Sequence, residues 1–296
     1  MKMPKVDGLT DRAMIAGLKL VPKNAVSRAA GHVAALRLPG PLRRAQLRAF
    51  ARAFQVDLQE AQEPLEAYGS IQEFFVRSLK EGARPVDQNQ DSFVSPCDGA
   101  WGETGTIDNG TLFQVKGRPY SVASLLADAE EASRFEGGTF VTLYLSPRDY
   151  HRFHAPCGGR VVRADYVPGT LWPVNHAGIQ HVHGVFAQNE RICAYLAPEE
   201  NNLEKYICMV AVGATMVGKV HVNFDELTTN VKNAWSVKRI YAGKEPALEK
   251  GEEWGRFEFG STIVLLLPKG LVDLDIAPNG TAVRLGSRIG RFIDSE

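Results

Sequence analysis

The sequence predicts an α+β fold in which a basic helical region, residues 1–85, precedes a mostly antiparallel β body, residues 86–296. Three observations support this prediction. Apolar residues recur at helical spacing over the first 80 residues, and short apolar runs broken by Gly, Pro and Asn follow from about residue 92. Residues 1–60 hold eleven Lys or Arg and four Asp or Glu, so this segment carries +7 in a chain of zero net charge.

The helical region contains three predicted helices. Thr10 can cap the first, which ends near Pro22, and Ser70 and Glu73 form a capping box before FFVRSL. Between them, PLRRAQLRAFARAF has an apolar face with a basic stripe beside it, made by Leu47, Phe50 and Phe54 and by Arg44, Arg48 and Arg52. This pattern suits a helix lying on anionic lipid, and equally a helix that packs on the core with a solvated flank.

The β body is predicted from apolar runs bounded by turn residues. The runs are FVTLYL (140–145), RVVRADYV (160–167), RICAYL (191–196), YICMVAVGATMVGKV (206–220) and STIVLLL (261–267). One helix is expected among them, capped by Ser121 and running through SLLADAEEA.

Composition excludes several classes of protein. Zero net charge argues against nucleic acid as the main partner. The four cysteines are widely spaced, without a CxxC pair, so neither a zinc knuckle nor a disulfide framework is indicated. We find no signal peptide and no run of the roughly 18–20 apolar residues that span a bilayer. The chain is expected to be soluble or peripheral, and its basic end favours an anionic surface.

Two histidines share the segment SPRDYHRFHAP. His151 and His154 have the spacing of a metal site on a helix, but they follow a strand and a turn-prone Ser-Pro-Arg-Asp. A structural role for either histidine remains an alternative. Their position after a strand end favours catalytic use of at least one.

Asp98 in SPCDG and Ser261 in FGSTIVLLL complete a possible set of reactive groups. Asp98 alone is more typical of a turn, and a serine at the start of an apolar strand is common. Together with a histidine, however, they supply the parts of an activated hydroxyl nucleophile.

These motifs closely resemble the bacterial phosphatidylserine decarboxylases. The resemblance runs in order over residues 56 to about 270, through SPCDG, YHRFHAP, YVPGTLWPVN and GRFEFGST. It is most specific at SPRDYHRFHAP and at FGST. The family usually has Leu where Phe259 stands, which keeps that position apolar, and it varies at the equivalents of Thr170 and Pro173.

The resemblance implies a proenzyme that cleaves itself between Gly260 and Ser261, giving chains 1–260 and 261–296. Ser261 would attack the Gly260 carbonyl, with His154 as base and Asp98 holding its tautomer, and would end as a covalent pyruvoyl group. That group would form a Schiff base with phosphatidylserine and release CO₂ and phosphatidylethanolamine. His151 is the implied proton donor.

The resemblance also implies partners and a location. The substrate is a membrane lipid, so we expect a peripheral protein on the cytoplasmic face of the cell membrane, bound to anionic phospholipid through its basic helices. The cleaved chains would form a heterodimer, and assembly into a homodimer is left open. Leu171, Trp172 and Pro173 are expected to cover the site or enter lipid, with core packing of Trp172 as the alternative.

Three other functions are alternatives for this sequence. A pyruvoyl enzyme for a soluble amino acid is disfavoured by the basic amphipathic amino terminus. A hydrolase with an intact Ser261 lacks the Gly-x-Ser-x-Gly elbow. A non-catalytic lipid-binding module would be favoured by loss of the reactive residues, and all of them are present.

Overall fold

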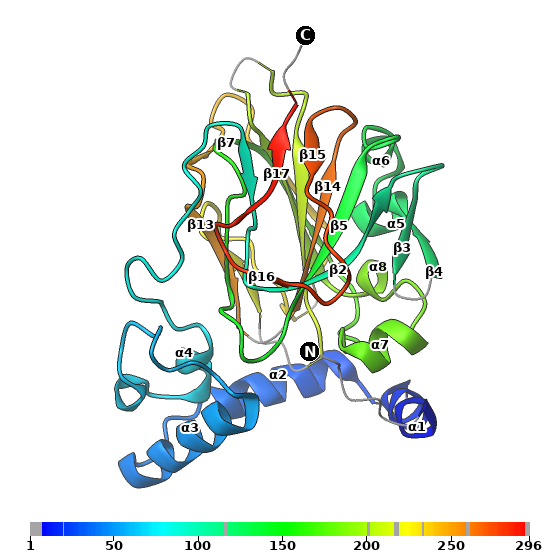
Figure 1. Ribbon diagram of the computed structural model, residues 1–296. Helices are drawn as coiled ribbons and strands as arrows, with labels where there is room; N and C mark the ends of the chain where they lie inside the picture. The colour runs from blue at the N-terminus through cyan, green and yellow to red at the C-terminus, as the bar shows by residue number, and fades with distance from the viewer. Residues whose placement is uncertain are drawn as a thin grey trace.

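The computed structural model describes residues 8–19, 21–114, 118–199, 202–215, 219–232, 234–258 and 261–293. One large antiparallel sheet forms the centre, with small sheets on one face, short helices on the other and the amino-terminal helices across one end (Figure 1). The predicted α+β class is therefore confirmed.

The amino-terminal helices cover the end of the main sheet that is lowest in Figure 1. They are α1 (Gly8–Lys19), α2 (Lys23–Ala34), α3 (Gly40–Phe54), the 3-10 turn η1 (Leu65–Ala67) and α4 (Ile71–Phe75). Leu47 of α3 is buried in a small cluster with Tyr68 and Phe74. Ser70 caps α4 by accepting a hydrogen bond from Glu73 N at 3.2 Å, as predicted. The Glu73 carboxylate accepts from Gly69 N, one residue before the position that a capping box predicts.

The main sheet has nine strands within the described residues, all paired antiparallel. Strand β14 lies between β9 and β5, so the STIVLLL run lies in the middle of the sheet. In spatial order the strands are β11 (Val237–Ile240), β7 (Gly159–Val167), β8 (Arg191–Ala197), β9 (Ile207–Val212), β14 (Ser261–Leu267), β5 (Thr139–Leu145), β2 (Gly99–Thr106) and β16 (Ala282–Val283), with β12 (Ala247–Leu248) also on β7.

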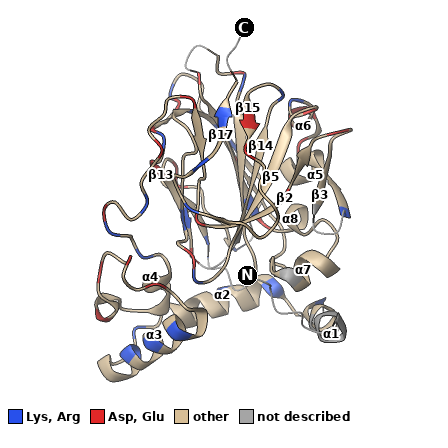
Figure 2. Ribbon diagram, viewed as in Figure 1, with Lys and Arg blue, Asp and Glu red and all other residues tan. Residues whose placement is uncertain are grey.

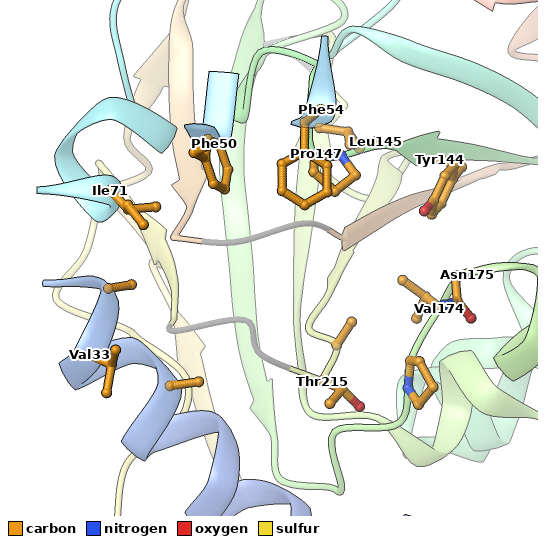
Figure 3. A pocket seen from close by; sticks show the side chains of 14 residues that line it. Val33, Phe50, Phe54, Ile71, Tyr144, Leu145, Pro147, Val174, Asn175 and Thr215 are labelled. Carbon is orange, nitrogen blue, oxygen red and sulfur yellow. The ribbon is translucent and has the colours of Figure 1, made fainter. Parts of the chain in front are cut away.

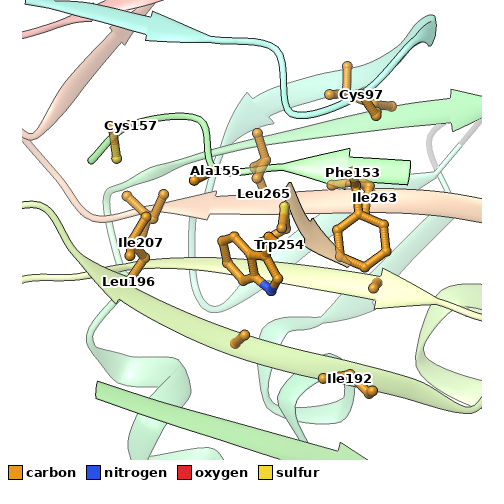
Figure 4. Close-up of a cluster of buried hydrophobic side chains, with 14 of the residues drawn as sticks. Cys97, Phe153, Ala155, Cys157, Ile192, Leu196, Ile207, Trp254, Ile263 and Leu265 are labelled. Carbon is orange, nitrogen blue, oxygen red and sulfur yellow. The ribbon is translucent and has the colours of Figure 1, made fainter. Parts of the chain in front are cut away.

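One face of the main sheet packs against two three-stranded sheets. Ile263 and Leu265 of β14 meet Phe153 and Trp254 in this core (Figure 4). The covering strands are β1 (Ser92–Val94), β17 (Arg288–Phe292) and β15 (Val272–Leu274), and β10 (Val220–Val222), β13 (Glu253–Phe257) and β6 (Arg152–His154).

The other face packs against short helices and a hairpin. Val264 and Leu266 of β14 meet Leu125 and Phe186 there. The covering elements are α5 (Val122–Leu126), α6 (Ala129–Ser133), α7 (His176–His181), α8 (Val185–Gln188), β3 (Thr111–Gln114) and β4 (Arg118–Ser121). Because both faces are buried, β14 is continuously apolar instead of alternating.

Four predicted elements differ from the structure. The first helix includes Gly8, so Thr10 lies inside it and does not cap it, and the helix after Ser70 ends at Phe75 instead of continuing through FFVRSL. The single helix expected after Ser121 is two helices, because Ala127 takes a left-handed conformation (φ 53°) and Asp128 caps a new helix by accepting from Glu131 N. The apolar run at 206–220 serves two sheets: β9 ends at Val212, before Gly213, and β10 begins at Val220. Residues 216–218 lie outside the described part.

Candidate active site

The segment from Leu145 to His151 holds the chain on both sides of residues 258–260. Leu145, the last residue of β5, pairs with Ser261, the first residue of β14. His151 accepts a hydrogen bond through its carbonyl from Phe257 N at 2.9 Å. The segment that carries SPRDYH therefore lies beside the predicted cleavage site. Gly260, Phe259 and the side chain of Ser261 lie outside the described part of the chain.

A tight turn shapes this segment. The carboxylate of Asp149 accepts hydrogen bonds from both the backbone N and the hydroxyl of Ser146, each at 2.7 Å. Burial raises the pKa of Asp149 above its ordinary value. The turn brings the next residues back toward β13, which is how His151 reaches Phe257.

His151 is completely buried, and its ring lies 3.9 Å from that of Phe75. Its Nδ1 is 2.8 Å from the carbonyl oxygen of Asp149, which can only accept, so Nδ1 carries the hydrogen. Burial, aided by the charge of Arg77, lowers the pKa of His151 to about 3. The ring is neutral at pH 7, and its basic Nε2 has no hydrogen-bond partner among the described residues.

His154 repeats this arrangement on β6. Its Nδ1 is 2.8 Å from the Gly251 carbonyl oxygen, and its buried Nε2 has no partner within the described residues. Burial lowers the pKa of His154, although the hydrogen bond to Gly251 raises it in part. His154 N also donates to Pro96 O at 2.7 Å, which places the backbone of His154 next to the SPCDG turn. Each histidine thus presents a neutral ring whose unprotonated Nε2 has no partner among the described residues.

Asp98 is buried near enough for its charge to act on His154, but its carboxylate is held by other groups. Its carboxylate accepts from Nε and Nη2 of Arg84, with a shortest distance of 2.6 Å, and from Leu285 N at 2.9 Å. In this structure the carbonyl of Gly251, and not Asp98, fixes the tautomer of His154. The charge of Asp98 is still among those that raise the pKa of His154, so it favours an imidazolium there.

Sequence reasoning missed Arg84, Gly251 and Phe75 as neighbours of the reactive residues. Phe75 lies in FFVRSL, the run after the predicted capping box, and no catalytic motif marks it. Arg84 and Gly251 stand in loops without periodicity or a motif, so no sequence signal pointed to them.

An apolar cavity of about 590 Å³ lies between the amino-terminal helices and the end of the main sheet (Figure 3). Helices α2 and α3 contribute Val33, Phe50 and Phe54, and the body contributes Tyr144 and Leu145. Because Leu145 pairs with Ser261, the cavity wall is one strand away from the predicted nucleophile. A mostly apolar cavity of this size fits hydrocarbon.

The predicted substrate-binding loop is divided between cavity and core. Pro173 lines the cavity. Leu171 and Trp172 are buried, and the indole donates to Gln188 at 3.1 Å while the Lys23 ammonium lies 3.9 Å from its ring. Trp172 therefore packs in the core, which was the alternative to a role in covering the site.

The outer surface of the amino-terminal helices is basic and partly apolar. Arg residues lie along α3 (Figure 2). Val33, Leu36 and Leu42 are each more than half exposed. Such a surface suits contact with anionic lipid headgroups. None of the helices formed by the described residues has the length and apolarity of a membrane span.

The sequence model of the family described as phosphatidylserine decarboxylase matches residues 71–291. That range contains Asp98, both histidines and Ser261. The chain belongs to the phosphatidylserine decarboxylase family.

Relatives in this family match over most of the chain. A protein named phosphatidylserine decarboxylase proenzyme from Anaeromyxobacter sp. (strain K) is 46% identical over 286 residues, covering 95% of this chain and 99% of its own length. Proteins of the same name from Myxococcus xanthus and Brevibacillus brevis are 41% and 42% identical, covering 95% and 83% of this chain and 99% and 86% of their own lengths.

Proposed function

We propose that this chain is the proenzyme of a phosphatidylserine decarboxylase, which cleaves itself between Gly260 and Ser261 and then converts phosphatidylserine to phosphatidylethanolamine and CO₂. The observation that carries the proposal is the 145–151 segment. It binds the chain on both sides of residues 258–260, ends at a histidine whose buried Nε2 has no partner in the described part of the chain, and borders an apolar cavity.

Cleavage needs a base for the Ser261 hydroxyl, and we assign this role to Nε2 of His154. Ser261 Oγ bonds to the Gly260 carbonyl carbon, the peptide C–N bond breaks, and the proton passes to the freed Ser261 amine. Loss of the Ser261 Cα proton then breaks the Cβ–Oγ bond and releases Gly260 as a carboxylate. One water converts the remaining dehydroalanine to a pyruvoyl group and ammonia.

The residues present fit a pyruvoyl group at position 261. The start of β14 is fixed by pairing with β5 and β9, so a carbonyl there would be rigidly positioned. The pyruvoyl group supplies an electrophile for the serine amine and an electron sink as CO₂ leaves. His151 returns a proton to the carbon that lost CO₂. Since His151 is neutral while buried, it must be protonated after the substrate enters, which the anionic headgroup favours.

The cavity and the basic surface support a lipid substrate over a free amino acid. The cavity takes acyl chain, while the exposed apolar and Arg residues of α2 and α3 contact anionic phospholipid. We therefore assign residues 1–85 to membrane association, on the cytoplasmic face of the cell membrane, and residues 86–296 to catalysis.

The two chains expected after cleavage, 1–260 and 261–296, would stay together as a heterodimer. Strand β14 is bonded on both sides to strands of the larger chain, and β17 is bonded to β1. Separation would break this core, so the small chain remains bound.

Intact mass measurement of the purified protein tests the proposal. We expect fragments 1–260 and 261–296, with a carbonyl at the amino terminus of the small fragment, and an uncut chain for Ser261→Ala. CO₂ should be released from phosphatidylserine vesicles and not from free serine. A wild-type chain that stays whole while decarboxylating phosphatidylserine would contradict the mechanism, and equal activity on free serine would contradict the lipid assignment.

A further inference from the structure

Arg84 binds Asp98 more closely than any other described side chain does. Nε lies 2.8 and 3.0 Å from the two carboxylate oxygens, and Nη2 lies 2.6 Å from the second oxygen. Both side chains are more than nine-tenths buried, at 9% and 8% exposure. Two planar groups joined by several hydrogen bonds have a defined mutual orientation.

Arg84 is itself anchored from a second direction. Its Nη2 also donates to Glu60 at 2.7 Å, and Nη1 donates to Ala83 O at 2.7 Å. Burial lowers the pKa of Arg84, but the hydrogen bonds with Asp98 and Glu60 raise it by more, so the guanidinium stays charged. Glu60 follows α3 and accepts through its carbonyl from Lys80 N, so the contact ties the helical region to the SPCDG turn.

A carboxylate in this position depends on such a partner. A buried carboxyl without a cation loses its charge or turns toward water, because an unpaired buried charge is costly. Asp98 has one further described hydrogen bond, from Leu285 N. That single neutral donor does not replace a charge-assisted pair.

The orientation of the Asp98 carboxylate determines how its charge acts on the imidazole of His154. His154 N donates to Pro96 O, two residues before Asp98, and the tautomer of His154 is already set by Gly251. What Asp98 adds is negative charge near an imidazole that must become positive when it takes the Ser261 proton.

We infer that Arg84 is a positioning residue for self-cleavage, which fixes the orientation of the Asp98 carboxylate in the SPCDG turn that binds the His154 backbone. This inference rests on the proposed function. It adds a fourth group to Ser261, His154 and Asp98 in maturation, one that acts through Asp98 and does not touch the scissile bond.

The test follows self-cleavage of the full chain over time after cell-free synthesis, on denaturing gels. Arg84→Gln should slow cleavage on the order of 100-fold, the lower end of what a positioned acid–base group contributes. Arg84→Lys keeps the charge and loses the planar fork, so it should cleave at an intermediate rate. Glu60→Gln, which leaves the Arg84–Asp98 pair in place, should cleave close to the wild-type rate.

Arg163→Gln is the matched control for loss of stability. Like Arg84, Arg163 is held by carboxylates, in this case those of Asp128, Glu131 and Asp165. It lies on the α6 side of the main sheet. The Arg163→Gln variant should have a melting temperature lowered about as much as that of Arg84→Gln, but it should cleave normally. Arg84→Gln should also turn over normally per pyruvoyl group once cleaved, because its role ends at maturation.

The outcomes separate the inference from the function on which it rests. Wild-type cleavage rates in Arg84→Gln, or equal slowing in Arg163→Gln, would overturn the role of Arg84 alone. If Arg84→Gln does not fold, Arg84→Lys tests the role of Arg84 instead. A folded Arg84→Lys variant that cleaves as fast as wild type would also overturn that role. A wild-type chain that does not cleave would overturn the proposed function as well.

Discussion

The middle of β14 and its first residue belong to one strand but lie in contrasting surroundings. Ile263 to Leu267 are fully buried on both faces among apolar side chains. The segment from Leu145 to His151 lies beside the Ser261 end, and the Nε2 atoms of His151 and, on β6, of His154 are buried without partners among the described residues. Each such atom costs about 1–3 kcal/mol, whereas apolar packing stabilises the fold. The strand thus joins an apolar core that stabilises the fold to a region whose buried polar atoms are available for catalysis.

The largest effect should follow removal of the proposed base. His154→Ala should slow self-cleavage roughly 10²–10⁴-fold, because no other described group takes its place. A time course of fragment formation measures this. His151→Ala is the control, since it removes a histidine with the same kind of backbone contact, and it should still cleave. Equal cleavage in both variants would remove the distinction between the two histidines.

Leu265→Ala should instead affect the fold. It empties space in the core, which costs about 2–5 kcal/mol of unfolding free energy. Urea unfolding in the Ser261→Ala background, where one uncut chain unfolds, gives the value. Val33→Ala, at an exposed position, should change it by less than about 0.5 kcal/mol. A large loss of turnover per cleaved Leu265→Ala molecule would contradict the separation of the two regions.

His151→Ala tests the role of this histidine in turnover. Once the variant is cleaved, decarboxylation per pyruvoyl group should fall by about 10²-fold, because the proton donor is missing. Release of CO₂ from phosphatidylserine vesicles, divided by the amount of small fragment, measures this. Full activity would exclude His151 as the donor.

Acid should lower the unfolding free energy through His151, whereas the described apolar core has no group that titrates in this range. The folded pKa of His151 is about 3, below the ordinary value of 6.5, so only the unfolded chain binds the proton between these values. The stabilisation is therefore complete above pH 6.5 and falls as pH drops, by about 1.4 kcal/mol per pH unit. Urea unfolding at pH 7, 6 and 5 should show a shallower pH slope for His151→Asn. Parallel curves would show that His151 does not contribute.

The smallest effect should come from filling the cavity. Ala30→Phe places a ring against the cavity wall and should weaken binding of long-chain phosphatidylserine by roughly tenfold, equivalent to about two buried methylenes. Short-chain substrate should bind nearly as before, and kcat should be unchanged. Comparing KM for the two lipids measures the difference. An equal rise in both KM values would show that acyl chain does not occupy the cavity.

Sequence patterns predicted the elements better than their contacts. The apolar runs located five of the nine described strands of the main sheet, and the predicted caps at Ser70 and Ser121 are present. The helix after Ser121 was predicted too long, because nothing in SLLADAEEA signals the left-handed conformation of Ala127. Helix propensity favours alanine inside a helix, so the break depends on tertiary packing.

By itself the sequence determined the fold class, the reactive residue types and their order along the chain, because periodicity and turn chemistry are local. Only the tertiary structure decided which groups meet. Asp98 binds Arg84 and Leu285, 14 and 187 residues away, and His154 binds Gly251, 97 residues away. The cavity likewise joins α2 and α3 to strand ends distant in sequence. These contacts depend on how the strands and helices pack, and no short sequence pattern encodes that.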